Sequence, residues 1–195
     1  CMGFFASIGF AQNKDSKGTD FWIAFPENFS GSPVLSLFIS GDENTTGTVS
    51  VPGISFTQNF SVTSGNITTV VIPANAQTST NNSIANRGIR ITAAKEVTVY
   101  ALNRIQFTTD AFLALPLDIL GTEYIISTYR NVGIVNGTQL TVVGTQDNTV
   151  VNITLSSAGD GRPAGVPFQV NLNAGQVYQI RNTSSSSADL TGSII

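Results

Sequence analysis

The stretch Ile89-Arg-Ile-Thr-Ala-Ala-Lys-Glu-Val-Thr-Val99 decides the fold class. Apolar side chains recur at every second residue, first at Ile89 and Ile91 and again at Val97 and Val99. Successive side chains of a β-strand point to opposite faces, so this period predicts strands with one buried face. The same alternation continues upstream at Ile54, Phe56, Phe60 and Val62.

Turn-forming residues separate the apolar stretches along the whole chain. They include Ser30–Pro33, Gly41–Gly47, Pro52–Gly53, Ser64–Asn66, Asn136–Gly137, Ser157–Gly161 and Ala174–Gly175. Residues of these types tolerate positive φ or hydrogen-bond to their own backbone. Short strands between frequent turns predict an all-β sandwich or barrel. Only Pro116–Gly121 is expected to hold a turn of helix.

Four segments of the first half are repeated in order in the second half. The aligned pairs are Phe21–Asn28 with Tyr124–Asn131, Leu37–Thr46 with Leu140–Thr149, Phe60–Asn66 with Val170–Gln176, and Arg87–Ile91 with Thr191–Ile195. The first two pairs share an offset of 103 residues. The third pair follows a small insertion.

These matches predict tandem antiparallel β-sandwich repeats at residues 18–120 and 121–195, with the second copy truncated. Strands expected at 97–102 and 111–115 close the first copy and have no counterpart in the second. A sandwich without its last strands has an unpaired sheet edge, so we expect the natural protein to be longer. A propeller-like or shared-sheet arrangement is the alternative, because pairing between copies leaves no mark on periodicity.

The N-terminus differs from the rest of the chain. Residues 1–11 are apolar, with small residues at Gly9 and Ala11, and residues 12–17 turn abruptly polar. This pattern predicts a signal-peptide remnant followed by a polar linker, with an ordinary first strand as the alternative. The run is too short to span a membrane, so we expect no transmembrane span. The predicted localisation is secreted or cell surface.

The composition excludes several classes of function. Only 11% of the 195 residues are charged, the net charge is −3, there is no histidine, and there is one cysteine. Without a basic cluster, nucleic acid is not an expected partner. Without histidine, the commonest general base and the commonest zinc ligand are both missing. One cysteine permits no internal disulfide.

Enzyme activity is not expected. Glu27, Asp110 and Glu123 are the carboxylates that we considered for a catalytic pair, but their spacing defines no cleft. Serine and cysteine nucleophiles have no histidine to activate them. We therefore expect no catalytic residues and no cofactor.

Two other segments offer side chains that could bind a ligand. The acidic turn Asp42-Glu-Asn44, with Asp147-Asn148 at the equivalent place, offers oxygen ligands for calcium, but its spacing favours a polar hairpin turn and no metal site. Trp22, the single tryptophan, could stack on a sugar ring. Because Phe21, Ile23 and Phe25 face one side and Trp22 the other, we expect instead a central strand that is buried on both faces.

Three motifs carry a family resemblance: Gly18-Thr-Asp-Phe-Trp-Ile-Ala-Phe-Pro-Glu-Asn28, Gly88–Tyr100, and Leu113–Pro116 leading into Leu120–Tyr124. In order and separation they resemble the N-terminal domain family of IgGFc-binding protein, over residues 18–195. The resemblance implies an extracellular module of a larger protein, here of a bacterial, Bacteroidetes type. The family's association with immunoglobulin Fc does not transfer, because the motif residues are turn glycines, core aromatics and strand starts. The ligand-binding residues are therefore unknown from sequence.

The sequence thus predicts a non-catalytic extracellular binding or adhesion module of a secreted or cell-surface protein. Its expected ligand is an extracellular protein or a mucin-like glycan. The recognition surface is expected in loops at one end of the sandwich or along a sheet edge. The alternatives are a carbohydrate-binding module attached to a hydrolase and a structural stalk repeat.

Overall fold

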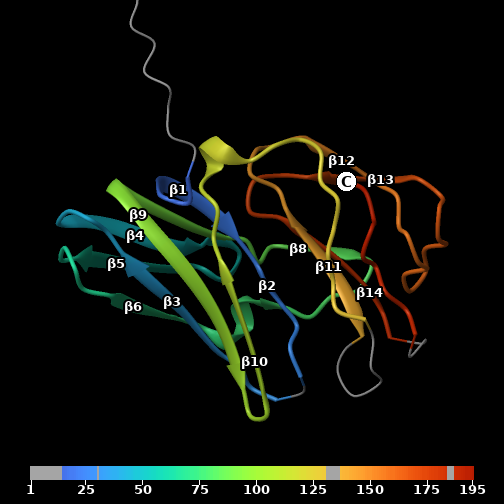
Figure 1. The fold of residues 1–195 in the computed structure, drawn as a ribbon, viewed down its shortest axis with the longest axis horizontal. Coiled ribbons are helices and arrows are strands. Elements are labelled where there is room, and N and C mark those ends of the chain that lie inside the picture. The colour runs from blue at the N-terminus through green and yellow to red at the C-terminus, as the bar shows by residue number, and fades with distance from the viewer. Residues whose placement is uncertain (1–14, 30, 131–136, 184–186) are drawn as a thin grey trace, which may run out of the picture.

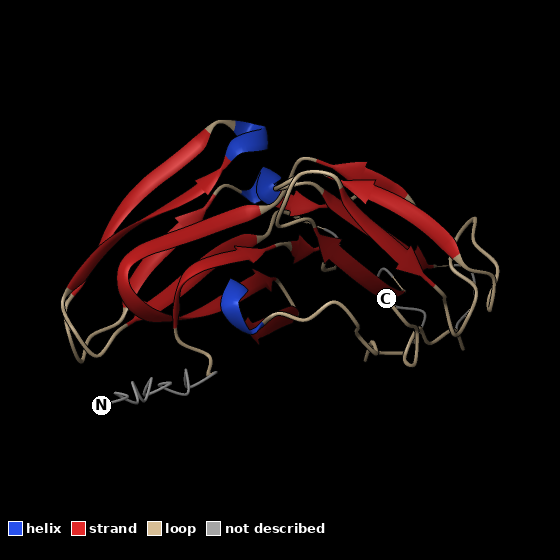
Figure 2. Cartoon of the chain, turned by 90° about the horizontal axis from the view of Figure 1, so that it is seen from above, coloured by secondary structure: helices blue, strands red, loops and turns tan. Residues whose placement is uncertain are grey.

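The structure is a computed structural model that describes residues 15–29, 31–130, 137–183 and 187–195. The described chain is built from antiparallel β-sheets packed as sandwiches, with three short 3-10 turns as its helical elements. The all-β prediction is therefore confirmed. Figures 1 and 2 show the strands in two groups that lie side by side. The expected signal-peptide remnant at residues 1–11 lies outside the described residues.

The first group, called here the N-terminal sandwich, has two sheets that share one strand. Its strands are β1 (Gly18–Ile23), β3 (Val34–Ser40), β4 (Thr45–Val51), β5 (Phe56–Val62), β6 (Thr68–Ile72), β9 (Ile89–Ile105) and β10 (Thr108–Leu113). One sheet is formed by β5, β4, β9 and β1, and the other by β6, β3, β9 and β10. The aliphatic and phenylalanine side chains between them form a buried cluster.

Strand β9 is longer than the alternation predicts. The sequence indicates separate strands around Ile89 and Val97, whereas the structure has one strand of 17 residues. Its first part, through Ala93, pairs with β4 and with most of β1, and Gly18 of β1 pairs with Val97 after a shift in register. Its second part, from Thr98, pairs with β3 and β10. The residues between these parts are largely exposed and break the alternation, so the strand passes from one sheet into the other there.

The second group, called here the C-terminal sandwich, encloses its own apolar cluster. Its strands are β11 (Thr138–Val143), β12 (Thr149–Ile153), β13 (Phe168–Leu172) and β14 (Val177–Asn182), and β8 (Ser83–Ala85) adds to its sheet. The sheet order is β11-β14-β8, with β12-β13 as the facing pair. Because β8 comes from the first half of the chain, its pairing with β14 links the two halves of the chain.

Short elements complete the chain. A parallel pair joins β2 (Phe25–Pro26) to β7 (Gln77–Thr78), and 3-10 turns occupy η1 (Pro52–Ile54), η2 (Ala74–Ala76) and η3 (Leu117–Ile119). The helical turn expected within Pro116–Gly121 is therefore confirmed at η3. The turn expected at Pro52–Gly53 is present as η1, but its 3-10 conformation and that of η2 were not expected, and Ile54 lies in η1 rather than in a strand.

Strand pairing in the two sandwiches follows one pattern. In the N-terminal sandwich, Trp22 and Ser50 both pair with Arg90. In the C-terminal sandwich, Ile125 and Thr154 both bridge to Ile194. The corresponding residues are 103 or 104 positions apart, close to the offset of the sequence matches. The division into repeats at residues 18–120 and 121–195 stays a prediction.

Candidate functional site

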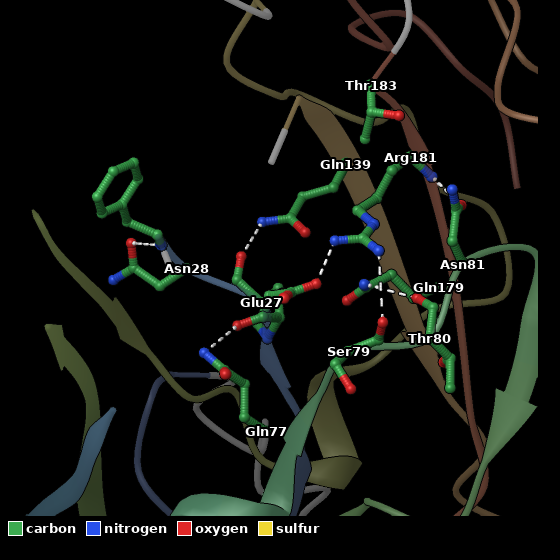
Figure 3. Close-up of polar contacts among 12 residues, drawn as sticks. Glu27, Asn28, Gln77, Ser79, Thr80, Asn81, Gln139, Gln179, Arg181 and Thr183 are labelled. Atoms are coloured by element: carbon green, nitrogen blue, oxygen red, sulfur yellow. Dashed lines mark hydrogen bonds and ion pairs between the residues drawn. The ribbon is translucent and has the colours of Figure 1, made fainter. Parts of the chain in front are cut away.

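The three carboxylates considered for catalysis have separate environments. Glu27 forms an ion pair with Arg181 of β14, between the two sandwiches (Figure 3). Asp110 lies on β10, and Glu123 is exposed in the loop after η3. The Glu27 pair is therefore part of the contact between the sandwiches.

Polar side chains around Glu27 join the two sandwiches (Figure 3). The Gln139 amide donates to the Glu27 carbonyl over 2.6 Å, and the Gln179 amide donates to the Thr80 carbonyl over 2.8 Å. The backbone N–H of Arg181 donates to the Asn81 side-chain oxygen over 2.9 Å. These bonds continue the β8–β14 pairing and hold the two sandwiches in one orientation.

Asp110 predicts a pH-dependent stability, although it is exposed on β10. Partial desolvation of its carboxyl raises the pKa above its ordinary value of 3.8. The folded state therefore favours the neutral acid, and this stabilisation is complete below pH 3.8 and is lost as pH rises through the raised pKa. Asp110→Asn stays neutral, so we expect it to be more stable than the wild type at pH 7 and equal to it near pH 3. Urea unfolding at both pH values measures this difference, and an identical difference at both would contradict it.

The acidic turn between β3 and β4 is neutralised by lysines. Lys17 pairs with Asp42, and Lys95 pairs with Glu43. The Asn44 side-chain oxygen accepts the Ser64 backbone N–H over 2.9 Å. At the equivalent turn the Asp147 carboxylate accepts the Ala174 N–H over 3.0 Å. Both turns thus use their oxygens to bind a second turn, between β5 and β6 or between β13 and β14. Within the described residues no three acidic or cysteine side chains gather where they could hold a metal ion.

Trp22 is buried, with 9% of its surface exposed, but not in the way the sequence indicates. Its strand β1 pairs with β9 alone and so is an edge strand, not a central one. The ring lies against Gly175, where an added Cβ would be 3.1 Å from it, and under the Arg90 guanidinium at 5.7 Å from the ring centroid. The C-terminal sandwich therefore covers the face that sugar stacking would need.

At the tip of the β9–β10 hairpin, the aromatic residue Phe107 is exposed and has a positive φ. β9 ends at Ile105 and β10 begins at Thr108, so Gln106 and Phe107 form a two-residue turn. Phe107 has φ of +81°, a conformation that typically requires Gly or Asn at this turn position. Its side chain is 86% exposed. A bulky residue in this region costs about 1–2 kcal/mol, and such strain concentrates at functional sites.

A buried asparagine fixes the hairpin against the loop that follows β2. The Asn28 amide donates to the Asn103 carbonyl over 3.0 Å, and its oxygen accepts the Thr108 hydroxyl over 2.7 Å. The same oxygen accepts the backbone N–H of Phe29 over 2.7 Å. Two loops far apart in sequence are thus held at one end of the sandwich, where Figure 1 shows the hairpin projecting.

The β9–β10 hairpin belongs to the sheet β6-β3-β9-β10, and the outer face of this sheet adjoins the hairpin tip. Its exposed or half-buried apolar side chains are Val34, Phe38, Val71, Tyr100, Leu102 and Leu113. Val34 pairs with Arg104, the only charged residue at the outward positions where β9 pairs with β3 and β10. Aromatic residues and arginine are enriched at protein interfaces, and acidic residues and lysine are depleted there. We call this face, together with Phe107, the hairpin-tip surface.

Sequence reasoning expected a recognition surface in end loops or at a sheet edge but named no residue of this surface. Phe107 carries no sequence signal, because Gln-Phe is not a recognised turn pair and φ cannot be read from composition. The sequence pattern places the apolar residues Tyr100 and Leu102 on the same face of their strand. Whether that face is exposed depends on where the C-terminal sandwich packs, which the pattern does not encode.

The model of a family described as IgGFc binding protein matches residues 110–195, which run from β10 through the C-terminal sandwich. The family resemblance is confirmed over this range, whereas the motifs Gly18–Asn28 and Gly88–Tyr100 lie outside the match.

No curated protein and no solved structure matches the chain. Among the described residues, no helix has the length and hydrophobicity that crossing a membrane requires. The IgGFc binding protein match is thus the comparison that bears on function, and it points to a binding protein.

Proposed function

We propose that this protein is a non-catalytic, extracellular module of a secreted or cell-surface adhesin, and that it binds a protein ligand through the hairpin-tip surface. The match of residues 110–195 to the IgGFc binding protein family supports a binding role with a protein as ligand. The observation that supports this binding surface is the exposure of Phe107 on a strained turn that Asn28 holds in place.

The chemistry of the hairpin-tip surface supports a protein rather than a glycan. Its apolar side chains extend over four strands, and Arg104 supplies the charge. Contiguous exposed apolar patches mark protein-interaction sites, and aromatic and arginine side chains carry most of the energy at such sites. The glycan alternative rested on Trp22, which the C-terminal sandwich covers.

Replacing Phe107 is expected to separate binding from stability. Phe107→Gly relieves the strained φ, so its free energy of unfolding should equal or exceed that of the wild type by up to about 1 kcal/mol. Loss of an exposed aromatic hot spot of about 2 kcal/mol should weaken binding about 30-fold. Surface plasmon resonance on immobilised immunoglobulin Fc and on mucin, beside a glycan array, measures the binding.

Val166→Ser is the matched control, because Val166 is an exposed apolar residue in a loop of the other sandwich, between β12 and β13. It should leave binding unchanged. Equal binding by the wild type and Phe107→Gly would contradict the assigned surface. Absence of binding to every probe would contradict the binding function itself, and a glycan ligand insensitive to Phe107 would favour the carbohydrate-binding alternative.

A further inference from the structure

Arg104 is an unpaired cation within the hairpin-tip surface. It lies on β9, three residues before Phe107, and its side chain is exposed. Among the described residues, no hydrogen bond, ion pair or aromatic ring engages its guanidinium group. The other basic side chains of this part of the chain have partners: Lys17, Arg90, Lys95 and Arg181 pair with carboxylates, Arg162 lies over Phe168, Arg87 donates to a carbonyl, and Arg130 interacts electrostatically with Asp189.

The strand register places Arg104 in the first of three cross-strand rows on the outer face of the sheet. From the hairpin tip inward, the rows are Thr109, Arg104 and Val34, then Ala111, Leu102, Ser36 and Val71, then Leu113, Tyr100, Phe38 and Thr69. Successive rows lie two residues apart along each strand, which is about 7 Å. The second and third rows are uncharged, and no position in the three rows carries a carboxylate.

This arrangement selects among the partners that could dock on the hairpin-tip surface. A partner that covers the two uncharged rows covers Arg104 as well, because the nearer row is only about 7 Å away. Burying a guanidinium group without a counter-charge costs free energy, whereas a carboxylate accepts two parallel hydrogen bonds from it. The unpaired arginine therefore disfavours partners without a carboxylate, and the apolar rows disfavour partners without apolar side chains.

The geometry points to a protein partner that presents an aspartate or glutamate carboxylate to Arg104, flanked by apolar side chains that cover the second and third rows about 7–13 Å away. This inference rests on the proposed binding function and names the chemistry of the ligand at the same surface. The net charge of the chain is −3, so long-range attraction would favour basic partners. A preference for an acidic partner must therefore come from the contact at Arg104.

Random peptides displayed on phage are the probe for this preference. Peptides enriched on the intact protein should combine Asp or Glu with aromatic or aliphatic residues, and those enriched on Arg104→Glu should carry Lys or Arg instead. The most enriched peptide is then synthesised with a fluorescent label, beside a version in which Asn and Gln replace each Asp and Glu. By fluorescence anisotropy, the wild type should bind the acidic peptide about tenfold or more tightly than the amide version. Arg104→Gln should bind the two equally.

Arg87→Gln is the matched control. It removes the same charge from the loop between β8 and β9, where Arg87 donates to the Asn86 carbonyl away from the three rows. It should keep the preference of the wild type for the acidic peptide. Equal binding of the acidic and amide peptides by the wild type, or an undiminished preference in Arg104→Gln, would overturn the proposal.

Phe107→Gly separates this proposal from the proposed function. If it weakens peptide binding but the wild type shows no preference for the acidic peptide, the surface stands and the carboxylate proposal fails. If it has no effect while the preference depends on Arg104, the contact at Arg104 stands and the role of Phe107 fails. Enrichment of no peptide overturns both. Binding of sialylated or sulfated glycans that is lost in Arg104→Gln, without binding of acidic peptides, would overturn the choice of a protein partner.

Discussion

Arg181→Ala is expected to lower the free energy of unfolding by about 2–3 kcal/mol. The change leaves the Glu27 carboxylate without its cation and also removes a 3.3 Å hydrogen bond to the Ser79 carbonyl (Figure 3). The two side chains are 12% and 25% exposed, so the loss should fall below the 3–5 kcal/mol typical of fully buried pairs. Urea unfolding monitored by circular dichroism measures it.

A double substitution distinguishes loss of the pair from loss of packing. Glu27→Gln combined with Arg181→Met leaves no unpaired charge, so the double variant should be more stable than Arg181→Ala. Lys95→Ala is the exposed control, because Lys95 pairs with Glu43 at side-chain exposures of 52% and 66%. It should cost about 0.5 kcal/mol or less. A similar loss for Lys95→Ala and Arg181→Ala would contradict the role given to the buried pair.

Gly88→Ala is expected to cost about 2–3 kcal/mol and to expose the single tryptophan. A Cβ at Gly88 would lie 2.7 Å from both the Cα and the carbonyl oxygen of Gly175, which are backbone atoms that cannot rotate away. The Gly88 N–H also donates to that carbonyl over 2.9 Å. Displacing Gly175 uncovers Trp22, so tryptophan emission should shift to longer wavelength along with the loss of stability.

Gly121→Ala is the control for this prediction. A Cβ at Gly121 meets no atom within 4 Å, and its φ is not in the left-handed region. Its stability and emission should match those of the wild type. If Gly88→Ala also kept its stability and emission, the backbone contact between the sandwiches would be looser than the structure has it.

The sequence predicted where the strands lie better than it predicted which strands pair with one another. Alternation at Ile89 and Val97 is a local property, and it located both parts of β9. The continuity of the strand could not be read, because Ala94, Lys95 and Glu96 at the bend have no apolar period and are exposed. The pairing of β8 with β14 joins residues nearly 100 positions apart and left no trace in either segment.

The candidate site was less accessible to sequence reasoning than the fold. Parity indicated that Trp22 is buried, but it could not show that the cover comes from Gly175 in the other sandwich. Phe107 depends on a single backbone angle, and Asn28 acts through contacts with Asn103 and Thr108 about 75–80 residues away. Such properties arise from tertiary packing, which a period of two does not encode.

The long strand β9 has a consequence for how the N-terminal sandwich folds and melts. Because one strand contributes to both sheets, neither sheet can detach while the other stays intact, so the sandwich should lose its structure in one cooperative step. Apart from β10, the strands that pair with β9 precede it by dozens of residues, so their contacts form only after long loops close. Chains dominated by such contacts fold in roughly milliseconds to seconds. We expect the pairing of β9 with the earlier strands to complete the folding of this sandwich.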